Sequence, residues 1–417
     1  MAVLVREEKT KRDYVMTETY ITFSVFALFA FAYSLIAGRL EKTIISGPIV
    51  FTFCGYLLGP QVFGVFEYQY NAESLRLIAE LTLGVILFVD ASLADLGVLR
   101  KSSAIPKRML LIGLPLVLLL GYGVGELIFT QMSWVYVALL ATMLAPTDAA
   151  LGKPVIANET VPANIRQGLN FESGLNDGIC VPILLVFLAI ATGEAGESRP
   201  IALVLSLVAQ EIGIGALVGV GLTLLGGSLM RICHERGWIT SIWMQLLIPS
   251  LAIACFTLAQ ALHGSGFIAS FIGGLVLNRM GSSKIHELTL PAEGVGEMLA
   301  MLTWLFFGIA VVGQFASSMS WEILLYAILS LTLIRILPIF VSLTGLGLDW
   351  QTKLFLGWFG PRGLASIVFV IIFVQASLPG VEVIVMTVSA TVVMSVLAHG
   401  VTANPLARIY VNRKTKI

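Results

Sequence analysis

The chain has 417 residues, of which 57% are hydrophobic and only 12% are charged, and this composition excludes a water-soluble domain of this size. The formal net charge is zero, so no nucleic-acid partner is expected. Repeated apolar runs of about 20 residues predict an all-α polytopic protein whose helices cross a membrane in contact with lipid.

Taken in chain order, the apolar runs predict about 13 membrane-spanning helices, at residues 19–37, 43–60, 74–92, 107–130, 133–157, 164–192, 201–230, 239–261, 264–279, 293–314, 320–344, 350–376 and 381–405. An odd number of spans places the two termini on opposite sides of the membrane. Most basic residues lie in one set of loops and in the C-terminal tail, whereas the other set holds Arg199 and an N-terminal segment whose basic residues are balanced by acids. The protein is expected in the cell membrane. By the positive-inside rule, its C-terminus is expected on the cytoplasmic side and its N-terminus on the outer side.

The fifth and twelfth expected spans are interrupted in the same way. One contains Pro146-Thr147-Asp148, and the other contains Gly360-Pro361-Arg362-Gly363. Because proline removes a helical hydrogen bond and disfavours helix at the preceding residue, each span is expected to be two half-helices that meet near mid-membrane. Asp148 is expected to cap the N-terminus of its second half-helix, and carbonyls freed near residues 142–147 are candidate cation ligands.

The spacing of the two interruptions predicts an internal repeat. The prolines are 361 − 146 = 215 residues apart, so spans 1–6 and 8–13 are interpreted as two six-helix repeats joined by span 7. An offset of seven helices inverts the second repeat across the membrane, and broken helices 5 and 12 are then expected to cross at mid-membrane. Inverted repeats with broken helices are typical of secondary transporters, which bind ions where the repeats meet.

The sixth span, near residues 164–192, is apolar in its second half, whereas its first half contains Glu172, Ser173, Asn176 and Asp177. A charge at this depth is expensive and normally faces a cavity or a partner. Residues four apart share a helix face, so Ser173 lies next to Asp177, and Glu172 next to Asn176. The two acids therefore point at different neighbours and are expected to do different jobs.

Other polar residues within the spans are compatible with either a structural pair or contact with an ion, and their roles stay open: Glu80, Asp90, Glu211 and Arg335. Glycines predict close helix packing at Gly174 and Gly178 and along residues 213–221 of span 7. The histidines are expected in loops or near helix ends and have no metal-ligand spacing: His234, His263, His286 and His399. No cofactor is expected.

Three motifs occur in order along the chain, namely Pro146-Thr147-Asp148, Glu172-Ser173-x-x-Asn176-Asp177 and Gly360-Pro361-Arg362-Gly363. Together they resemble the NhaP-type sodium/proton antiporters of the monovalent cation:proton antiporter-1 family. This resemblance implies a homodimer, in which residues 19–98 and 239–314 form a dimerisation domain and residues 201–231 a linker helix. Residues 105–192 and 320–405 would form an ion-translocating core that moves as an elevator.

The resemblance also implies a set of site residues. Asp177 would be the carboxylate that binds the cation and the proton in turn, with Ser173 and the main-chain oxygen of Thr147 as further cation ligands; Asp148 and Asn176 complete the candidate site. Glu172 would form an ion pair with Arg362. Asn176 stands where electrogenic relatives have a second aspartate, so we expect electroneutral 1:1 exchange of Na⁺ or Li⁺ for H⁺, with the Asn176 amide bonded to backbone near the crossover.

Three alternatives remain open at this point. A channel usually has a ring or filter built by several subunits, and the motifs here form one asymmetric acidic site. A membrane hydrolase would need paired catalytic carboxylates or a nucleophile with a base, and no histidine lies near a core serine or cysteine. A potassium/proton antiporter of the same fold cannot be distinguished by ligand type, because Na⁺ and K⁺ both bind oxygen.

Overall fold

The computed structural model describes residues 2–40, 43, 45–65, 72–94, 104–156, 158, 160–193, 201–280, 285–310, 319–376, 378 and 381–414. These residues are helical or irregular, and none of them lies in a strand. The helices are α1 (Ala2–Leu40), α2 (Gly47–Leu58), α3 (Ala72–Leu93), α5 (Ala104–Arg108), the π-helix η1 (Met109–Gly113), α6 (Leu114–Ile128), α7 (Trp134–Met143), α8 (Ala149–Ile156), α9 (Ala163–Ala191), α10 (Ile201–Glu235), α11 (Ser241–Ala261), α12 (Gly266–Arg279), α13 (Ile285–Ala310), α15 (Trp321–Leu331), α16 (Leu333–Ser342), α17 (Trp350–Trp358), α18 (Leu364–Gln375) and α19 (Val381–Lys414).

Among the described residues, eight helical stretches are long and apolar enough to cross a membrane when α5–α6 and α15–α16 are each taken as one stretch, and four shorter helices are also apolar. The protein is therefore a multi-pass, all-α membrane protein, as the sequence predicts. Two expected spans contain breaks that the sequence does not predict: a π-helical turn, η1, precedes α6, and Thr332 leaves the helical conformation between α15 and α16, with φ −112° and ψ −90°. Helix α1 begins at Ala2, well before the expected start at residue 19.

A first helix group, consisting of α2, α3 and α10–α13, packs through backbone contacts at glycines. A Cβ at Gly55 or Gly308 would lie 2.1 Å from a backbone oxygen of the facing helix in the α2–α13 pair. On α10, a Cβ at Gly215 or Gly219 would lie 2.5 or 2.4 Å from a backbone oxygen of α12. The close packing expected for the glycine-rich span is confirmed, because these contacts bring α10 directly against α12.

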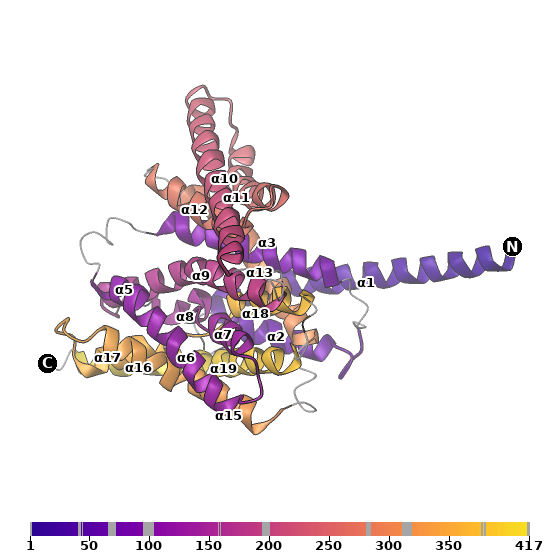
Figure 1. The fold of residues 1–417 in the computed structure, drawn as a ribbon. Coiled ribbons are helices and arrows are strands. Elements are labelled where there is room, and N and C mark those ends of the chain that lie inside the picture. The colour runs from indigo at the N-terminus through magenta and orange to yellow at the C-terminus, as the bar shows by residue number, and fades with distance from the viewer. Residues whose placement is uncertain are drawn as a thin grey trace.

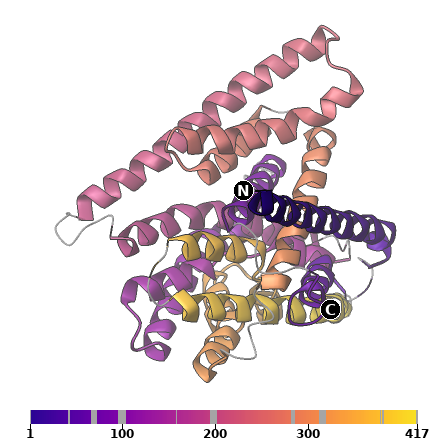
Figure 2. The same ribbon diagram turned by 90° about the vertical axis from the view of Figure 1, so that its right-hand side faces the viewer.

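A second helix group consists of α5–α9 and α15–α19, which pack on one another. In Figure 1 it fills the lower half of the molecule together with α2, whereas α10, α11 and α12 lie at the top and α3 and α13 lie between. Figure 2 shows α10 and α11 running side by side along the upper edge. The two groups meet where α9 contacts α3, α10 and α12, where α18 contacts α3 and α13, and where α19 contacts α2.

Candidate functional site

Two extended segments lie at the centre of the second group. Residues 144–148 join α7 to α8, and residues 359–363 join α17 to α18, so the chain leaves the helical conformation at each proline motif. The segments touch directly, because the Asp148 backbone N–H donates a 2.8 Å hydrogen bond to the Pro361 carbonyl oxygen. Four half-helix ends therefore converge on one place.

Asp148 caps two helices at once. Its Oδ1 accepts a 3.3 Å hydrogen bond from the backbone N–H of Leu151, in the first turn of its own helix α8, as the sequence predicts. Its Oδ2 accepts a 2.9 Å bond from the backbone N–H of Leu364, the first residue of α18. A carboxylate at a helix N-terminus satisfies free N–H groups and opposes the positive end of the helix dipole. The approach depends on Gly363, since a Cβ there would lie 1.9 Å from Asp148 Oδ2.

Arg362 is fully buried and caps the opposite kind of helix end. Its Nη1 donates to the carbonyl oxygens of Ala145 at 2.6 Å and Pro146 at 3.0 Å, just beyond the C-terminus of α7. The expected ion pair between Glu172 and Arg362 is therefore wrong as a direct contact. The freed carbonyls at the end of α7 offer the guanidinium nearer acceptors, at the negative end of a helix dipole.

The partner of Glu172 is Arg335 from α16. The two side chains are 2% exposed and form parallel hydrogen bonds of 2.5 Å (Nη1 to Oε1) and 2.6 Å (Nη2 to Oε2). A Cβ at Gly360 would lie 2.1 Å from Arg335 Nε, so the guanidinium passes directly over this glycine. The sequence analysis treats Arg335 only as an arginine within an apolar span, because the break at Thr332 that aims it has no proline or glycine beside it; the nearest proline, Pro338, lies six residues later inside α16.

Thr147, Ser173 and Asn176 form a chain of hydrogen bonds beside the crossing. Asn176 Nδ2 donates to Thr147 Oγ1 at 2.7 Å, the Thr147 and Ser173 hydroxyl oxygens are 3.0 Å apart, and Ser173 Oγ donates to the Thr147 carbonyl oxygen at 3.0 Å. The Asn176 amide thus bonds to a side chain rather than to the expected backbone group. Three of the candidate site residues therefore lie together, Thr147 from the crossing segment and Ser173 and Asn176 from α9.

Asp177 lies one residue after Asn176 on α9 and is 8% exposed. Its Oδ1, like the Oδ1 of Asn176, is buried and accepts no hydrogen bond from the part of the chain that the structure describes. A buried polar atom without a partner is costly, and such atoms in native proteins call for a specific explanation. The site therefore holds a free carboxylate oxygen one helical turn after Ser173, on the same face of α9.

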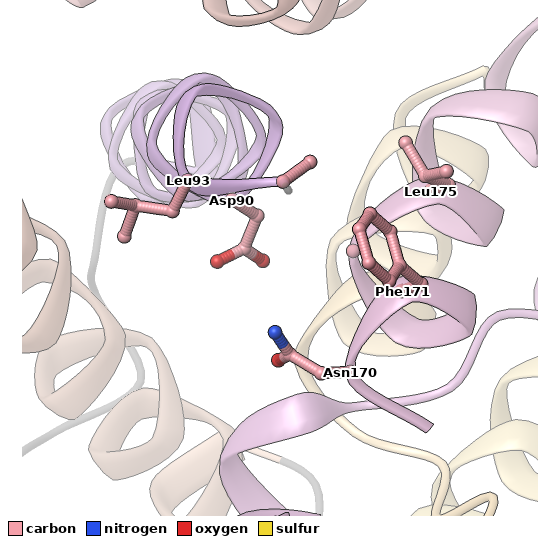
Figure 3. Close-up of a pocket in the computed structure, with 7 residues that line it drawn as sticks. Asp90, Leu93, Asn170, Phe171 and Leu175 are labelled. Atoms are coloured by element: carbon pink, nitrogen blue, oxygen red, sulfur yellow. The ribbon is translucent and has the colours of Figure 1, made fainter. Parts of the chain in front are cut away.

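The glycines of α9 face the first helix group. A Cβ at Gly174 would lie 3.5 Å from the Cβ of Asp90 on α3, and a Cβ at Gly178 would lie 2.7 Å from the Phe271 ring on α12. The close helix approach expected from these glycines is confirmed at Gly178, whereas at Gly174 a Cβ would make only an ordinary van der Waals contact. Between α3 and α9 lies a cavity of about 80 Å³, lined by Asp90, Leu93, Ala94, Asn170, Phe171, Gly174 and Leu175. Figure 3 shows the Asp90 carboxylate and the Asn170 amide pointing toward one another across it.

Two other residues left open by the sequence analysis, and one histidine, lie outside this cluster. Glu80 forms an ion pair with Arg76 within α3. The Glu211 carbonyl oxygen accepts a 3.1 Å bond from the backbone N–H of Ser265, which joins α10 to the start of α12. His399, expected in a loop or near a helix end, is instead buried within α19 and contacts the Trp358 carbonyl oxygen.

Comparisons with known proteins agree with this geometry. The family described as sodium/hydrogen exchanger, transmembrane, matches residues 25–409, nearly the whole chain. The chain belongs to this family. This exchanger is therefore a secondary transporter and not an enzyme, and the NhaP-type resemblance of its three motifs is confirmed.

Two curated relatives illustrate the range of the family. A Na⁺/H⁺ antiporter from Schizosaccharomyces pombe is 24% identical over 375 residues, which cover 86% of this chain and 79% of the relative. The K⁺/H⁺ antiporter NhaP2 from Shewanella oneidensis is 22% identical over 280 residues, which cover 67% of this chain but only 48% of the relative. The exchanger thus spans about half the length of that second protein.

Among solved structures, the exchanger is similar to the sodium proton antiporter MjNhaP1 from Methanocaldococcus jannaschii, with a TM-score of 0.72 and 20% sequence identity. The match covers 91% of this chain and 98% of the other. At this identity, the likeness establishes that the two chains share a fold.

Proposed function

We propose that this protein exchanges one Na⁺ or Li⁺ for one H⁺ across the cell membrane. The observation that carries the proposal is Asp177, a buried carboxyl group whose Oδ1 has no hydrogen-bond partner among the described residues and which lies next to a polar cluster on α9. A carboxylate in this position can hold a proton or a cation, but not both. Competition for one group couples the two fluxes, since each ion leaves only when the other replaces it.

The cation would be held by oxygen atoms, the ligands that hard cations prefer. Asp177 supplies a carboxylate, Ser173 a hydroxyl, and Thr147 a carbonyl oxygen. Asn176 donates to Thr147 Oγ1 and so fixes the side chain next to that carbonyl. Asp148 holds both broken helices and contributes its negative charge without contacting the ion.

The charges around the crossing support electroneutral exchange. Glu172 and Asp148 carry two negative charges and Arg335 and Arg362 carry two positive charges, so these four groups sum to zero. Asp177 is neutral when protonated, and an ionised Asp177 with one bound monovalent cation is neutral as well. The two loaded states therefore carry the same net charge, and one proton replaces one cation.

We assign the transport movement to the two helix groups. Residues 19–98 and 239–314 would form the stationary domain, with residues 201–231 as a linker, and residues 105–192 and 320–405 the moving core. This assignment is supported by the close backbone contacts at glycines that join helices of the first group, and by the Glu172–Arg335 ion pair that joins helices of the second. The cavity between α3 and α9 offers a route to Asp177, because Gly174 in its wall is one turn from that carboxylate.

We also propose a homodimer joined through the first domain, with the N-terminus outside and the C-terminus in the cytoplasm. The positive-inside pattern supports this orientation. Native mass spectrometry from detergent would give twice the chain mass if the dimer forms. A single-chain mass at all protein concentrations would contradict it.

Dequenching of a pH-sensitive dye in proteoliposomes tests the function. Addition of Na⁺ or Li⁺ to vesicles with an acidic interior should raise the internal pH, and Asp177→Asn protein at the same density should give no response. The K⁺/H⁺ relatives favour a second candidate, exchange of K⁺. A response to K⁺ but not to Na⁺ or Li⁺ would establish that alternative, and no response to any cation would overturn the proposal.

A further inference from the structure

Helices α17 and α19 are joined by a row of side-chain hydrogen bonds. Near the start of α17, Thr352 Oγ1 and Tyr410 Oη are 2.9 Å apart. Near its end, Trp358 Nε1 donates to Thr402 Oγ1 at 3.0 Å, and His399 Nε2 lies 2.9 Å from the Trp358 carbonyl oxygen. Trp358 is the last helical residue of α17, and the hydrogen bonds to α19 continue beyond it, at Arg362 in the crossing segment.

The contacts of Ser395 and His399 replace a helical hydrogen bond that is lost where α17 is interrupted. In an unbroken helix, the Trp358 carbonyl would accept from the N–H of Arg362, four residues later. Here the Arg362 N–H donates to Ser395 Oγ at 2.7 Å, and the Trp358 carbonyl meets His399 Nε2 and the Gly360 N–H. Ser395 Oγ and His399 Nδ1 are themselves 3.2 Å apart.

Together these contacts bridge the broken ends of the helix. The Arg362 N–H donates to Ser395 Oγ and His399 Nε2–H donates to the Trp358 carbonyl oxygen, while His399 Nδ1 lies 2.9 Å from the Ser395 carbonyl oxygen, closer than it lies to Ser395 Oγ. The imidazole is 1% exposed, and the Trp358 ring lies 5.0 Å from it between centroids. The surrounding packing therefore holds the ring in one orientation.

We infer that His399 and Ser395 are positioning residues for the cation site, which set the path of crossing segment 359–363 by bridging the broken ends of its helix. The inference rests on the proposed function. The connection to the site runs through Arg362, whose backbone is held by Ser395 and whose guanidinium holds the carbonyls of Ala145 and Pro146. Thr147, a proposed cation ligand, is the next residue.

Two substitutions of His399 distinguish the effect of its hydrogen bond to Trp358 from the effect of its packing. In His399→Gln, the amide nitrogen occupies about the place of Nε2 and can still donate to Trp358. In His399→Asn, the amide is shorter and reaches only the place of Nδ1. We expect His399→Asn and Ser395→Ala each to raise the Na⁺ concentration for half-maximal exchange about tenfold, the effect of one lost buried hydrogen bond. His399→Gln should restore most of the affinity.

The matched control is Tyr410→Phe, which breaks the same helix pair away from the crossing by removing one hydroxyl. It should lower the melting temperature of the purified protein without changing the Na⁺ dependence. Because the bridge acts as a unit, the double variant His399→Asn/Ser395→Ala should weaken Na⁺ affinity no more than either single change.

Na⁺-induced stabilisation against heat gives a second readout that requires no transport. The inference is overturned if His399→Asn lowers the melting temperature but leaves the Na⁺ midpoint of this stabilisation unchanged, or if Tyr410→Phe shifts the midpoint equally. It is also overturned if His399→Gln is no better than His399→Asn. A parent protein that neither exchanges nor binds a cation would instead refute the proposed function, which separates the two failures.

Discussion

Glu172 on α9 and Arg335 on α16 are 163 residues apart in the chain and form two parallel hydrogen bonds within the protein interior. Each belongs to a different expected repeat, so the ion pair joins the two halves beside the crossing. Planar guanidinium and carboxylate groups match each other in this geometry, which a lysine cannot reproduce.

Removing one partner of this pair should be strongly destabilising. We expect Arg335→Ala to lower the free energy of unfolding by about 3–5 kcal/mol, because Glu172 is left as an uncompensated buried charge. Thermal unfolding in detergent would measure the loss. The double variant Glu172→Leu/Arg335→Met removes both charges and should recover much of the stability. A double variant as unstable as Arg335→Ala would show that packing, rather than charge, dominates.

Asp177→Asn should abolish exchange while the protein keeps its fold. The amide has nearly the volume of the carboxyl group, but it neither ionises nor releases a proton. The expected result is no cation-driven dye response in proteoliposomes, together with an unchanged elution volume and a melting temperature at or above that of the parent. Any cation-driven proton movement in this variant would refute Asp177 as the shared site.

Arg362→Ala should impair both stability and cation affinity. It removes two charged hydrogen bonds to the carbonyls before Thr147, each worth about 1.5–3 kcal/mol. The matched control is Arg108→Ala, because Arg108 also caps carbonyls at a helix end, those of Ser342 and Thr344 after α16. Arg108→Ala should lower the melting temperature alone. If both variants keep the parent's Na⁺ dependence, Arg362 has no role at the site beyond folding.

Gly363→Ala should disrupt the crossing although it adds a single methyl group. The new Cβ would lie 1.9 Å from Asp148 Oδ2, so the carboxylate must give up its cap on α18 or the segments must separate. A loss of about 1–3 kcal/mol is expected from overpacking, seen as a lower melting temperature. Gly123→Ala on α6 is the control, since a Cβ there meets nothing within 4 Å. Equal effects of the two changes would contradict the steric argument.

Membrane potential should not shift the end point of exchange. A potential acts on net charge at about 2.3 kcal/mol per charge per 100 mV, and an electroneutral cycle moves no net charge. Proteoliposomes clamped with valinomycin and K⁺ gradients should therefore reach the same Na⁺/H⁺ end point at every imposed voltage, once K⁺ has been excluded as a substrate. A voltage-dependent end point would mean that a second group carries a proton, with Asp148 and Glu172 tested first.

The sequence predicts the fold class well because apolar runs and prolines are local signals. The breaks at Pro146 and Pro361, the Asp148 cap on α8 and the close packing of Gly178 can all be recognised from neighbouring residues. The wrong partner of Glu172 has a non-local cause, since the choice between Arg335 and Arg362 depends on where two distant helices end. Thr332 is not itself a helix-breaking residue, and the nearest proline, Pro338, lies six residues later inside α16, so it does not mark the position of the break that aims Arg335.

The histidine in α19 illustrates a second limit. His399 lies near the end of an expected span, and a lone histidine there has no distinctive spacing. Its partners are the main-chain oxygen of Trp358 and, one turn earlier in α19, the main-chain oxygen and hydroxyl of Ser395. The Trp358 oxygen becomes available only because α17 stops at Trp358. Such a contact is invisible until the break in one helix is placed against the face of another.

The reciprocal capping at the crossing also bears on how the protein is made. The carbonyls of Ala145 and Pro146 receive their hydrogen bonds from Arg362, and the second oxygen of Asp148 receives its bond from Leu364, 216 residues later. A ribosome delivers the first broken helix to the bilayer long before these donors exist, and an unsatisfied polar group there costs several kcal/mol. The first repeat is therefore inserted without these caps and receives them only when the second repeat arrives. In a protein divided between α9 and α10, we expect the crossing to form only when both halves share one membrane.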